Sequence, residues 1–431
     1  MYRKIMPYLE TWQESTHRKP LILQGARQVG KTYSVLEFGR THYDNVAYFN
    51  FETNPKLNKT FEENISPDYL IPILSHMAGQ TIVKEKTLIV FDEVQLCERA
   101  LISLKYFCED APDYHIIVVG SLLGVAVNRA KFSFPVGKVD MKTLYPMDME
   151  EFMLALGEDN LVSQIKESFV SDKPLPSALH DAAMQLYRQY LVVGGMPECV
   201  MQYAETKDYI LVRHTQDTIL ASYLNDMSKY NNLNEIKKTR LTYDNITVQL
   251  SKKNTRFQYK LIKKGGRASE FENAIEWLCL SGIVSQVYRV GQIKKPLENY
   301  RDIDAFKIYV SDMGLLCAKK DVAANDILYM VDELNDFKGG MTENYVNVQL
   351  LINGYNTYYW QSGRGAEIDF VIQREGKLIP IEVKSADNTR AKSLKVYMDT
   401  FSPEYAIKLS SKNFGFEDNK KIVPLYATFC I

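Results

Sequence analysis

The stretch Gly25-Ala-Arg-Gln-Val-Gly-Lys-Thr32 decides the fold of this chain. It follows the pattern G-x-x-x-x-G-K-[ST], which is the phosphate-binding loop (P-loop) of nucleoside triphosphatases. The apolar run Pro20–Gln24 before it suits a buried parallel strand, and residues 33–38 after it can begin a helix. A glycine turn that matches by chance is the alternative, but all four fixed positions occur in the strand–loop–helix context that the motif requires. We therefore predict a nucleotide-binding unit at residues 20–38.

The predicted nucleotide contacts are the loop and the residue after it. Backbone N–H groups of the loop and of the helix N-terminus would surround the phosphates, where the helix dipole favours negative charge. Lys31 would reach the β- and γ-phosphates, and the Thr32 hydroxyl would bind Mg²⁺. The expected contact residues are Gly25, Ala26, Arg27, Gln28, Val29, Gly30, Lys31, Thr32 and Tyr33. ATP and Mg²⁺ are the expected cofactors.

The bulk composition is that of a globular protein with several domains. A chain of 431 residues predicts two to four domains, and 46% hydrophobic with 24% charged residues is ordinary for the class. The net charge of −1 gives no general attraction to nucleic acid or to anionic membranes. We see no signal peptide and no apolar run of 18 residues, and the six dispersed cysteines suit reduced thiols. We expect a cytoplasmic protein without a membrane partner.

Two carboxylates end the apolar segment Thr87–Glu93. This pattern is typical of a buried strand that emerges at the carboxyl edge of a parallel sheet, where ligands bind in doubly wound folds. Asp92 would hold Mg²⁺ (the Walker B role), and Glu93 would orient or deprotonate the attacking water. Two solvated acids at a strand end are the alternative, which the upstream P-loop disfavours.

A third apolar segment, His115–Gly120, ends in Ser121. A small polar residue there suits a sensor of the γ-phosphate or of the attacking water, and a simple turn is the alternative.

Residues 236–267 are unusually basic, with ten lysines and arginines. They favour a surface that contacts the phosphate backbone of nucleic acid. A solvated helix face balanced by acids elsewhere is an equally good interpretation. The helix expected at 269–281 and the strand-like segments at 283–290 and 306–310 resemble a winged helix.

The C-terminal third predicts three short strands at 357–360, 367–372 and 378–384. Asp369 lies between two apolar residues, and Glu382 and Lys384 share one face of their strand. Two carboxylates and a lysine on adjacent strands suit metal-assisted phosphodiester hydrolysis. A surface hairpin with ordinary charge alternation is the alternative, and spacing alone favours it.

Taken together, the motifs resemble a family of bacterial and archaeal ATPases. It joins an AAA-type (AAA_14-like) P-loop domain to a C-terminal region called DUF4143. The resemblance rests on residues 21–32, Phe91-Asp-Glu-Val-Gln95, Val119-Gly-Ser121, Leu144-Tyr-Pro146, Glu151-Phe152, residues 191–198, and the terminal Tyr-Tyr-Trp, Glu-Ile-Asp-Phe and Ile-Glu-Val-Lys-Ser segments.

The resemblance implies further roles. Ser121 matches the sensor position, and Gly194, Gly195 and Pro197 match a lid motif near the base in related ATPases. The C-terminal strands are similar to a restriction-endonuclease-like core. In that core Glu343, Asp369 and Glu382 would be metal ligands, and Asp369, Glu382 and Lys384 would be catalytic.

One position departs from the family. Many relatives carry Gly-Arg before the Tyr-Pro segment, where this chain has Gly137-Lys138. A lysine cannot reproduce the bidentate guanidinium fork, so an arginine-finger role is in doubt here. Arg129 is a weaker candidate for that role.

These observations predict an α/β chain with four parts. Residues 1–155 would form the P-loop ATPase domain and 156–205 a helical lid. Residues 206–325 would form a winged-helix-like region and 326–431 a restriction-endonuclease-like α/β domain. We expect an ATPase coupled to the nuclease-like domain and acting on nucleic acid, with a homo-oligomer left open. The alternative is a non-catalytic nucleotide-dependent switch with a degenerate nuclease-like domain.

Overall fold

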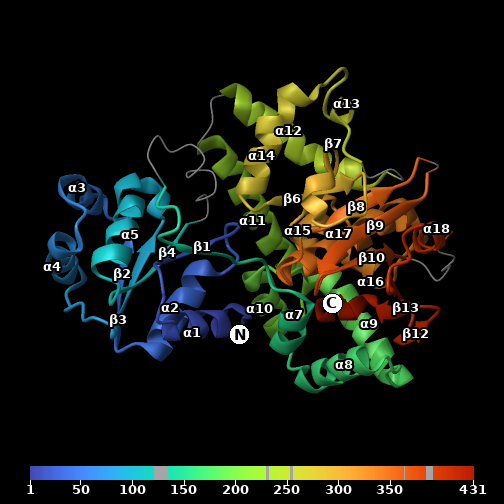
Figure 1. The fold of residues 1–431 in the computed structure, drawn as a ribbon, viewed down its shortest axis with the longest axis horizontal. Coiled ribbons are helices and arrows are strands. Elements are labelled where there is room, and N and C mark those ends of the chain that lie inside the picture. Colours follow the sequence, from blue (N-terminus) through green and yellow to red (C-terminus); the bar gives the residue numbers. More distant parts are fainter. Residues whose placement is uncertain (121–133, 230–232, 253–255, 364, 385–391) are drawn as a thin grey trace. The chain divides into compact units, whose positions relative to one another are not determined.

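The computed structural model describes residues 1–120, 134–229, 233–252, 256–363, 365–384 and 392–431. The chain forms two compact units, which Figure 1 shows. The N-terminal unit comprises Tyr2–Tyr145 together with Leu280–Gly282, and the C-terminal unit comprises Pro146–Cys279 and Ile283–Ile431.

The N-terminal unit is built on a five-stranded sheet in which every pair of neighbours is parallel. The strand order is β2-β3-β4-β1-β5. The strands are β1 (Leu21–Gln24), β2 (Asn45–Asn50), β3 (Thr87–Asp92), β4 (His115–Val119) and β5 (Asp140–Thr143). The predicted parallel sheet is confirmed, and the strand before the P-loop lies inside it.

Helices cover both faces of this sheet. They are α1 (Ile5–Glu14), α2 (Lys31–His42), α3 (Pro55–Glu63), α4 (Pro67–Ala78) and α5 (Glu98–Asp110), with a 3₁₀ turn at Val94–Leu96. Every residue of β3 and β4 is buried, as expected for strands enclosed on both sides. Phe61 of α3, Leu74 of α4 and Phe107 of α5 share one core with Phe91 of β3. Figure 1 shows α1 and α2 on the opposite side of the sheet from α5.

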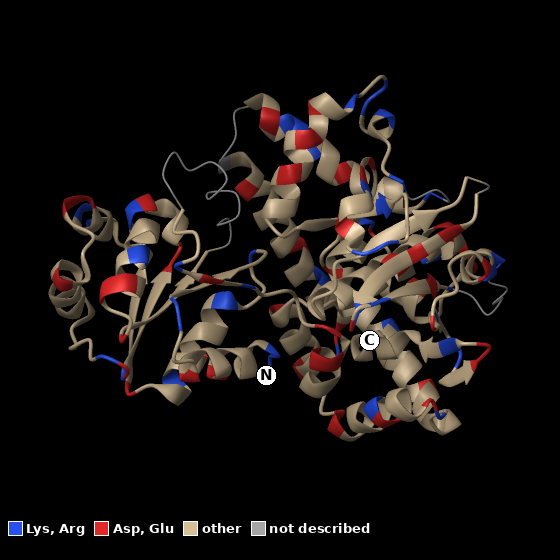
Figure 2. Ribbon diagram, viewed as in Figure 1, with Lys and Arg blue, Asp and Glu red and all other residues tan. Residues whose placement is uncertain are grey.

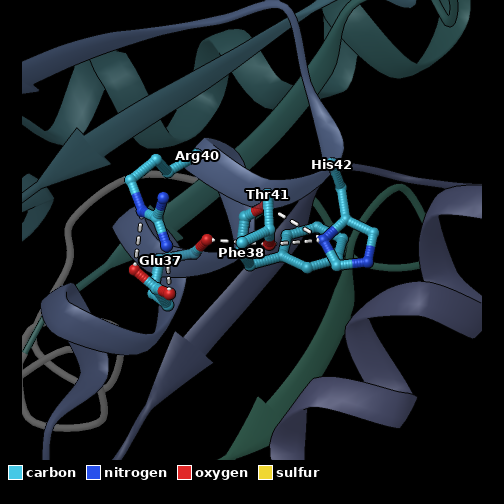
Figure 3. A network of polar contacts seen from close by, with 5 residues as sticks. All are labelled: Glu37, Phe38, Arg40, Thr41 and His42. Atoms are coloured by element: carbon cyan, nitrogen blue, oxygen red, sulfur yellow. Dashed lines mark hydrogen bonds and ion pairs between the residues drawn. The ribbon is translucent and has the colours of Figure 1, made fainter.

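The end of α2 carries a polar network, shown in Figure 3. Arg40 and Glu37 form a solvent-exposed ion pair of 2.7 Å, and the Thr41 hydroxyl donates to the Glu37 carbonyl at 2.9 Å. The His42 ring stacks on Phe38 with ring centroids 4.6 Å apart. An exposed pair of this kind contributes little to stability.

Helices dominate the first half of the C-terminal unit. They are α7 (Met149–Ala155), α8 (Asp159–Ser171), α9 (Ser177–Val193), α10 (Pro197–Thr206), α11 (Tyr209–Lys229), α12 (Leu233–Leu250), α13 (Tyr259–Ile262) and α14 (Ala268–Leu280). Later helices are α15 (Met313–Lys319), α16 (Ala324–Leu328), α17 (Asn335–Ile352) and α18 (Lys392–Phe401), with 3₁₀ turns at Leu297–Tyr300, Asp332–Leu334 and Leu425–Cys430. Within the described ranges, no helix is both long and apolar enough to cross a membrane.

A mixed eight-stranded sheet forms the other half of this unit, in the order β12-β13-β11-β10-β9-β8-β6-β7. Its strands are β6 (Val284–Val290), β7 (Arg301–Val310), β8 (Tyr358–Gln361), β9 (Glu367–Arg374), β10 (Lys377–Val383), β11 (Ala406–Ser410), β12 (Gly415–Glu417) and β13 (Lys420–Pro424). On one face, Leu394 and Tyr397 of α18 pack in a core with Trp360 and Ile368. This mixed sheet is consistent with the predicted nuclease-like core.

The expected boundary at residue 325 falls between strands of one sheet. β6 pairs in parallel with β8 and antiparallel with β7, so the two strands expected to form a wing belong to the C-terminal sheet, with β7 at its edge. A cut at residue 325 would break the backbone hydrogen bonds between β6 and β8. Residues 156–205, the expected lid, and α7 likewise belong to the C-terminal unit.

Candidate functional site

The P-loop lies between β1 and α2, and its backbone conformation requires glycine. Gly25 has φ of 144°, and a Cβ there would lie 2.1 Å from the Leu144 carbonyl oxygen. Gly30 caps α2 in the left-handed conformation with φ of 88°. The buried Arg3 guanidinium donates to the carbonyls of Val29 and Tyr145, each at 2.8 Å. Arg3, to which sequence reasoning assigned no role, thus holds the loop.

Lys31 is the first residue of α2, and its side chain is almost completely buried. Its Nζ donates to the loop carbonyls of Gly25 at 3.0 Å and Ala26 at 2.7 Å. The loop therefore holds the ammonium group beside its own backbone, and phosphate binding by Lys31 stays a prediction.

The Asp92 carboxylate at the end of β3 collects three donors. Its Oδ2 accepts from the Thr32 hydroxyl at 3.0 Å and from the Tyr48 hydroxyl at 2.7 Å, and its Oδ1 accepts from the Glu93 N–H at 2.9 Å. Burial raises the pKa of Tyr48 to about 12, and the hydrogen bond to Asp92 and the Asp92 charge add to this shift, so the phenol stays a donor. Sequence reasoning missed Tyr48, which lies on β2, because only the pairing of β2 with β3 places it beside Asp92.

Glu93 follows Asp92 with φ of 52°, a left-handed conformation that is uncommon for this residue type. Burial raises its pKa, and the Asp92 charge adds to that shift, whereas the hydrogen bond from Gln95 and the charges of Lys31 and Arg27 oppose it. A carboxylate with a raised pKa is a better proton acceptor near neutral pH.

Three of the predicted positions around this site need separate comment. Ser121 and Arg129 lie outside the described residues. Lys138, which stands where many relatives carry arginine, forms an ion pair of 2.8 Å with Glu109 on the surface of the N-terminal unit.

Gly195, a predicted lid residue, has a local structural explanation. Its N–H donates to Asp312 Oδ2 at 2.6 Å, and its carbonyl accepts from the Met147 N–H at 2.6 Å. A Cβ at Gly195 would lie 2.0 Å from the Met147 carbonyl oxygen. Pro197 begins α10, where its fixed φ suits a helix start. These contacts lie within the C-terminal unit and explain both residues without a nucleotide; their predicted contact with nucleotide stays a prediction.

The C-terminal candidates come from α17, β9 and β10. Asp369 Oδ2 accepts from the Val383 N–H at 2.7 Å, and Glu382 pairs with Lys384. Burial raises the pKa of Asp369, and the charges of Glu343 and Glu382 raise it further. The three acids and the lysine therefore lie close enough to act on one another.

A second lysine, Lys307 of β7, enters this group. Its Nζ lies 2.7 Å from Glu367 Oε1 and 3.2 Å from Glu343 Oε2, and its side chain is 1% exposed. Tyr309, two residues along the same strand face, donates to Glu343 at 2.9 Å. Sequence reasoning gave neither Lys307 nor Glu367 a role. The available signal was a charged residue inside the otherwise apolar run 305–310.

The two predicted metal sites differ in how well their residues fit a cation. At the P-loop, one carboxylate and one hydroxyl meet, which suits Mg²⁺ held mainly by phosphates and water. In the C-terminal sheet, no three His, Cys, Asp or Glu side chains of the described chain are arranged to hold a metal ion. Glu343, Glu367 and Glu382 contact lysines and Asp369 accepts from a backbone N–H, so the donor set does not fit a metal.

The basic stretch 236–267 lies on α12, on α13 and in the segments around them. Figure 2 shows acidic and basic residues interleaved on α12 and α14, with basic residues around α13. A cavity of about 1070 Å³ opens here. Its lining residues are Leu233, Asn234, Glu235, Lys237, Lys238, Leu241, Lys263, Glu270 and Phe271. The surface is therefore mixed in charge, and it combines lysines with exposed leucines.

The parallel sheet, the P-loop and the acidic end of β3 define a P-loop ATPase domain of the AAA type. Comparison with protein families agrees: residues 17–153 match the family described as "AAA domain". Residues 338–428 match "Domain of unknown function (DUF4143)", and residues 184–326 match "Domain of unknown function (DUF8612)". The chain therefore joins an AAA-type P-loop ATPase domain to a DUF4143 region, and the resemblance drawn from the motifs is confirmed.

Solved structures resemble the chain only distantly. A Walker-type ATPase of Pyrococcus abyssi is 14% identical with a TM-score of 0.45, over 74% of this chain and 95% of that protein. The Aeropyrum pernix ORC2 protein is 12% identical with a TM-score of 0.37, over 79% of this chain and 95% of that protein. Among curated proteins, none matches the chain significantly.

Proposed function

We propose that this protein hydrolyses ATP with Mg²⁺ at the P-loop of its N-terminal unit. The observation that carries the proposal is the hydrogen bond of 3.0 Å between the Thr32 hydroxyl and Asp92, which joins the P-loop to the end of β3. Lys31 and Glu93 lie close enough for the lysine charge to affect the pKa of the glutamate. A cation ligand, a phosphate-binding ammonium and a candidate base thus belong to one site.

Each residue has a distinct task in the proposed reaction. Lys31 binds the phosphate oxygens, Thr32 and Asp92 hold the metal, and Glu93 orients the attacking water and accepts its proton. Mg²⁺, when bound, neutralises charge on the phosphates. Ser121 is proposed as the sensor of the γ-phosphate on sequence grounds alone.

Turnover of ATP by three variants tests the proposal. We expect Lys31→Ala to lower nucleotide affinity, and Glu93→Gln to keep that affinity and lower turnover by about 100-fold or more. Glu37→Gln is the matched control, because it makes the same chemical change at an exposed glutamate of α2 (Figure 3) and should leave turnover unchanged. Wild-type turnover no higher than that of Glu93→Gln would refute the ATPase.

We also propose that the basic stretch contacts nucleic acid. Lys237, Lys238 and Lys263 line the same cavity, which supports a cluster of phosphate contacts. Replacing all three by glutamate should weaken binding of labelled duplex DNA and lower the slope of log affinity against log salt by roughly 3, at about 0.9 for each lost contact.

The control for this experiment changes three exposed lysines of the N-terminal unit, Lys56, Lys59 and Lys84, in the same way. Both triple variants alter the net charge equally. If they weaken DNA binding equally, the attraction is a matter of net charge, and the cavity is not the contact surface.

The C-terminal sheet supports two roles for the coupled domain. In the first, Asp369, Glu382 and Lys384 cleave nucleic acid with a metal bound by Glu343, Asp369 and Glu382. In the second, the domain is degenerate, and ATP binding switches its interaction with a partner. The ion pairs of Lys307 favour the second. Cleavage with Mg²⁺ or Mn²⁺ that is lost in Asp369→Ala would favour the first.

A further inference from the structure

Lys307 is surrounded by carboxylates although it comes from a strand that the nuclease-like motif does not include. Its ammonium group bonds to Glu367 at 2.7 Å and to Glu343 at 3.2 Å. It also lies 5.1 Å from the centroid of the Tyr359 ring. Lysine is almost never fully buried without a partner, and here two acids serve as partners.

These acids are placed around an ammonium group. A divalent cation such as Mg²⁺ or Ca²⁺ takes carboxylate oxygens at about 2.0–2.6 Å, whereas the oxygens around Lys307 Nζ lie at hydrogen-bonding distances. The other acids are also engaged, since Asp369 accepts from the Val383 N–H and Glu382 pairs with Lys384.

The anchoring of Glu343 supports the same conclusion. The neighbouring Asn344 bonds to both the N–H and the carbonyl of Val310, at 2.7 and 2.8 Å, and so fixes α17 against β7. Tyr309 donates to the Glu343 oxygen that also faces Lys307. Glu343 is therefore held next to the lysine by contacts on both elements.

We propose that the Lys307 ammonium is the resident cation of this acid cluster and that it excludes a divalent metal, so that the C-terminal sheet carries no metal-dependent nuclease chemistry. The proposal does not depend on ATP hydrolysis. A divalent ion among these acids would lie close to the buried ammonium, and the two like charges would repel strongly at low dielectric.

The charge count gives a further consequence. The cluster consists of Glu343, Glu367, Asp369, Glu382, Lys307 and Lys384. Without Lys307, four acids would face a single lysine. Glu382 Oε2, which is buried and has no hydrogen-bond partner within the described residues, would then be available to a divalent cation.

The test uses the full chain without nucleotide, in an Asp92→Asn background that removes the carboxylate of the P-loop site. Mn²⁺ binding is measured by electron paramagnetic resonance, and thermal unfolding is followed with and without Mn²⁺. We expect Lys307→Met to unfold at lower temperature, to bind Mn²⁺ at least about tenfold more tightly than the background, and to be stabilised by it. Adding Asp369→Asn should abolish the gain.

Lys408→Met is the matched control. Lys408 lies in β11 of the same sheet and is also buried, but no carboxylate of the described chain lies within ion-pair distance of it. Its replacement should change Mn²⁺ affinity by less than about twofold. An equal gain in both variants would mean that removing a buried positive charge is sufficient, and it would overturn the specific role of Lys307.

A second comparison decides the matter even if Lys307→Met does not fold. The background protein and its Asp369→Asn variant both retain Lys307, so the proposal requires that they bind Mn²⁺ equally. Mn²⁺ binding by the background that Asp369→Asn removes would overturn the proposal. A folded Lys307→Met protein that binds no more Mn²⁺ than the background would also overturn it.

Discussion

Replacing Asp312 by asparagine should remove a pH dependence from the stability of the C-terminal unit. Asp312 is fully buried, and its carboxylate accepts hydrogen bonds from the backbone N–H groups of Gly195 at 2.6 Å and of Leu315 at 2.8 Å. Burial raises its pKa to about 6, although these hydrogen bonds oppose the shift. The folded protein is therefore less stable when Asp312 is ionised, as at neutral pH, than when Asp312 is protonated.

The sign and size of the effect follow from proton linkage. In the unfolded chain the pKa of an aspartate is about 3.9, so the folded protein binds more protons between about pH 4 and the folded pKa of about 6. The contribution of Asp312 to stability is present below about pH 4 and is lost as the pH rises through about 6. A shift of about two units, at 1.36 kcal/mol each, gives about 3 kcal/mol.

Urea unfolding followed by tryptophan fluorescence measures this effect. A Trp12→Phe background removes the tryptophan of the N-terminal unit, so that Trp277 and Trp360 report on the C-terminal unit alone. The quantity to compare is the difference in unfolding free energy between Asp312→Asn and the background at each pH. All other titrating groups cancel in that difference.

We expect this difference to shift by about 2 kcal/mol in favour of Asp312→Asn between pH 4 and pH 7, because part of the full effect falls below pH 4. The asparagine also turns an amide N–H towards a backbone N–H, which adds a cost that does not vary with pH. A difference that stays constant within 0.5 kcal/mol, roughly the margin for additive effects, would show that Asp312 titrates normally and would refute the reasoning.

Three further predictions follow from other contacts. Burial lowers the pKa of His115 to about 4. The unfolding free energy of the N-terminal unit should therefore fall by about 3 kcal/mol as the pH drops from 6.5 to 4. Urea unfolding of His115→Gln should not show this loss. Tyr48→Phe removes one hydrogen-bond donor from Asp92 at a partly exposed site. We expect it to cost about 1 kcal/mol of transition-state stabilisation, or about fivefold in kcat/KM for Mg-ATP, whereas Asp92→Asn should cost at least about 100-fold. Equal losses in the two variants would contradict a positioning role for Tyr48. Gly195→Ala places a Cβ against the Met147 carbonyl, so the unfolding free energy of the C-terminal unit, measured in urea, should fall by about 3 kcal/mol. Weaker nucleotide binding at unchanged stability would instead support the lid role.

The N-terminal unit was largely predictable because its signals are local. The residues from β1 through the P-loop into α2 are contiguous, and each fixed position has a backbone or phosphate-binding reason within that stretch. The acids at the end of β3 were placed correctly because parallel strands present their carboxyl ends at the same edge of a sheet. Two residues escaped prediction here: Tyr48, whose contact with Asp92 depends on strand pairing, and Arg3, which bonds to carbonyls distant in sequence.

The C-terminal unit was harder to predict because its interactions are distant in sequence. The two strands expected to form a separate wing pair with each other, but β6 also pairs with β8 and so joins both to the C-terminal sheet, since a strand edge is satisfied by whichever partner the chain brings to it. The lid role of the Gly-Gly-Met-Pro segment stays a prediction, but the contacts of Gly195 with Met147 and Asp312 could not be predicted, because no local pattern connects these residues.

The sequence by itself determined that an AAA-type P-loop domain is present and predicted the residues of its nucleotide site, because a phosphate-binding loop is specified by a few adjacent residues. It also singled out Glu343, Asp369 and Glu382 of the C-terminal acid cluster, although not Glu367. Only the tertiary structure decided what neutralises those acids, because Lys307 reaches Glu343 and Glu367 from a strand 36 and 60 residues away along the chain. Charge balance in a buried site is a property of all the elements that meet there, and no single stretch of sequence contains it.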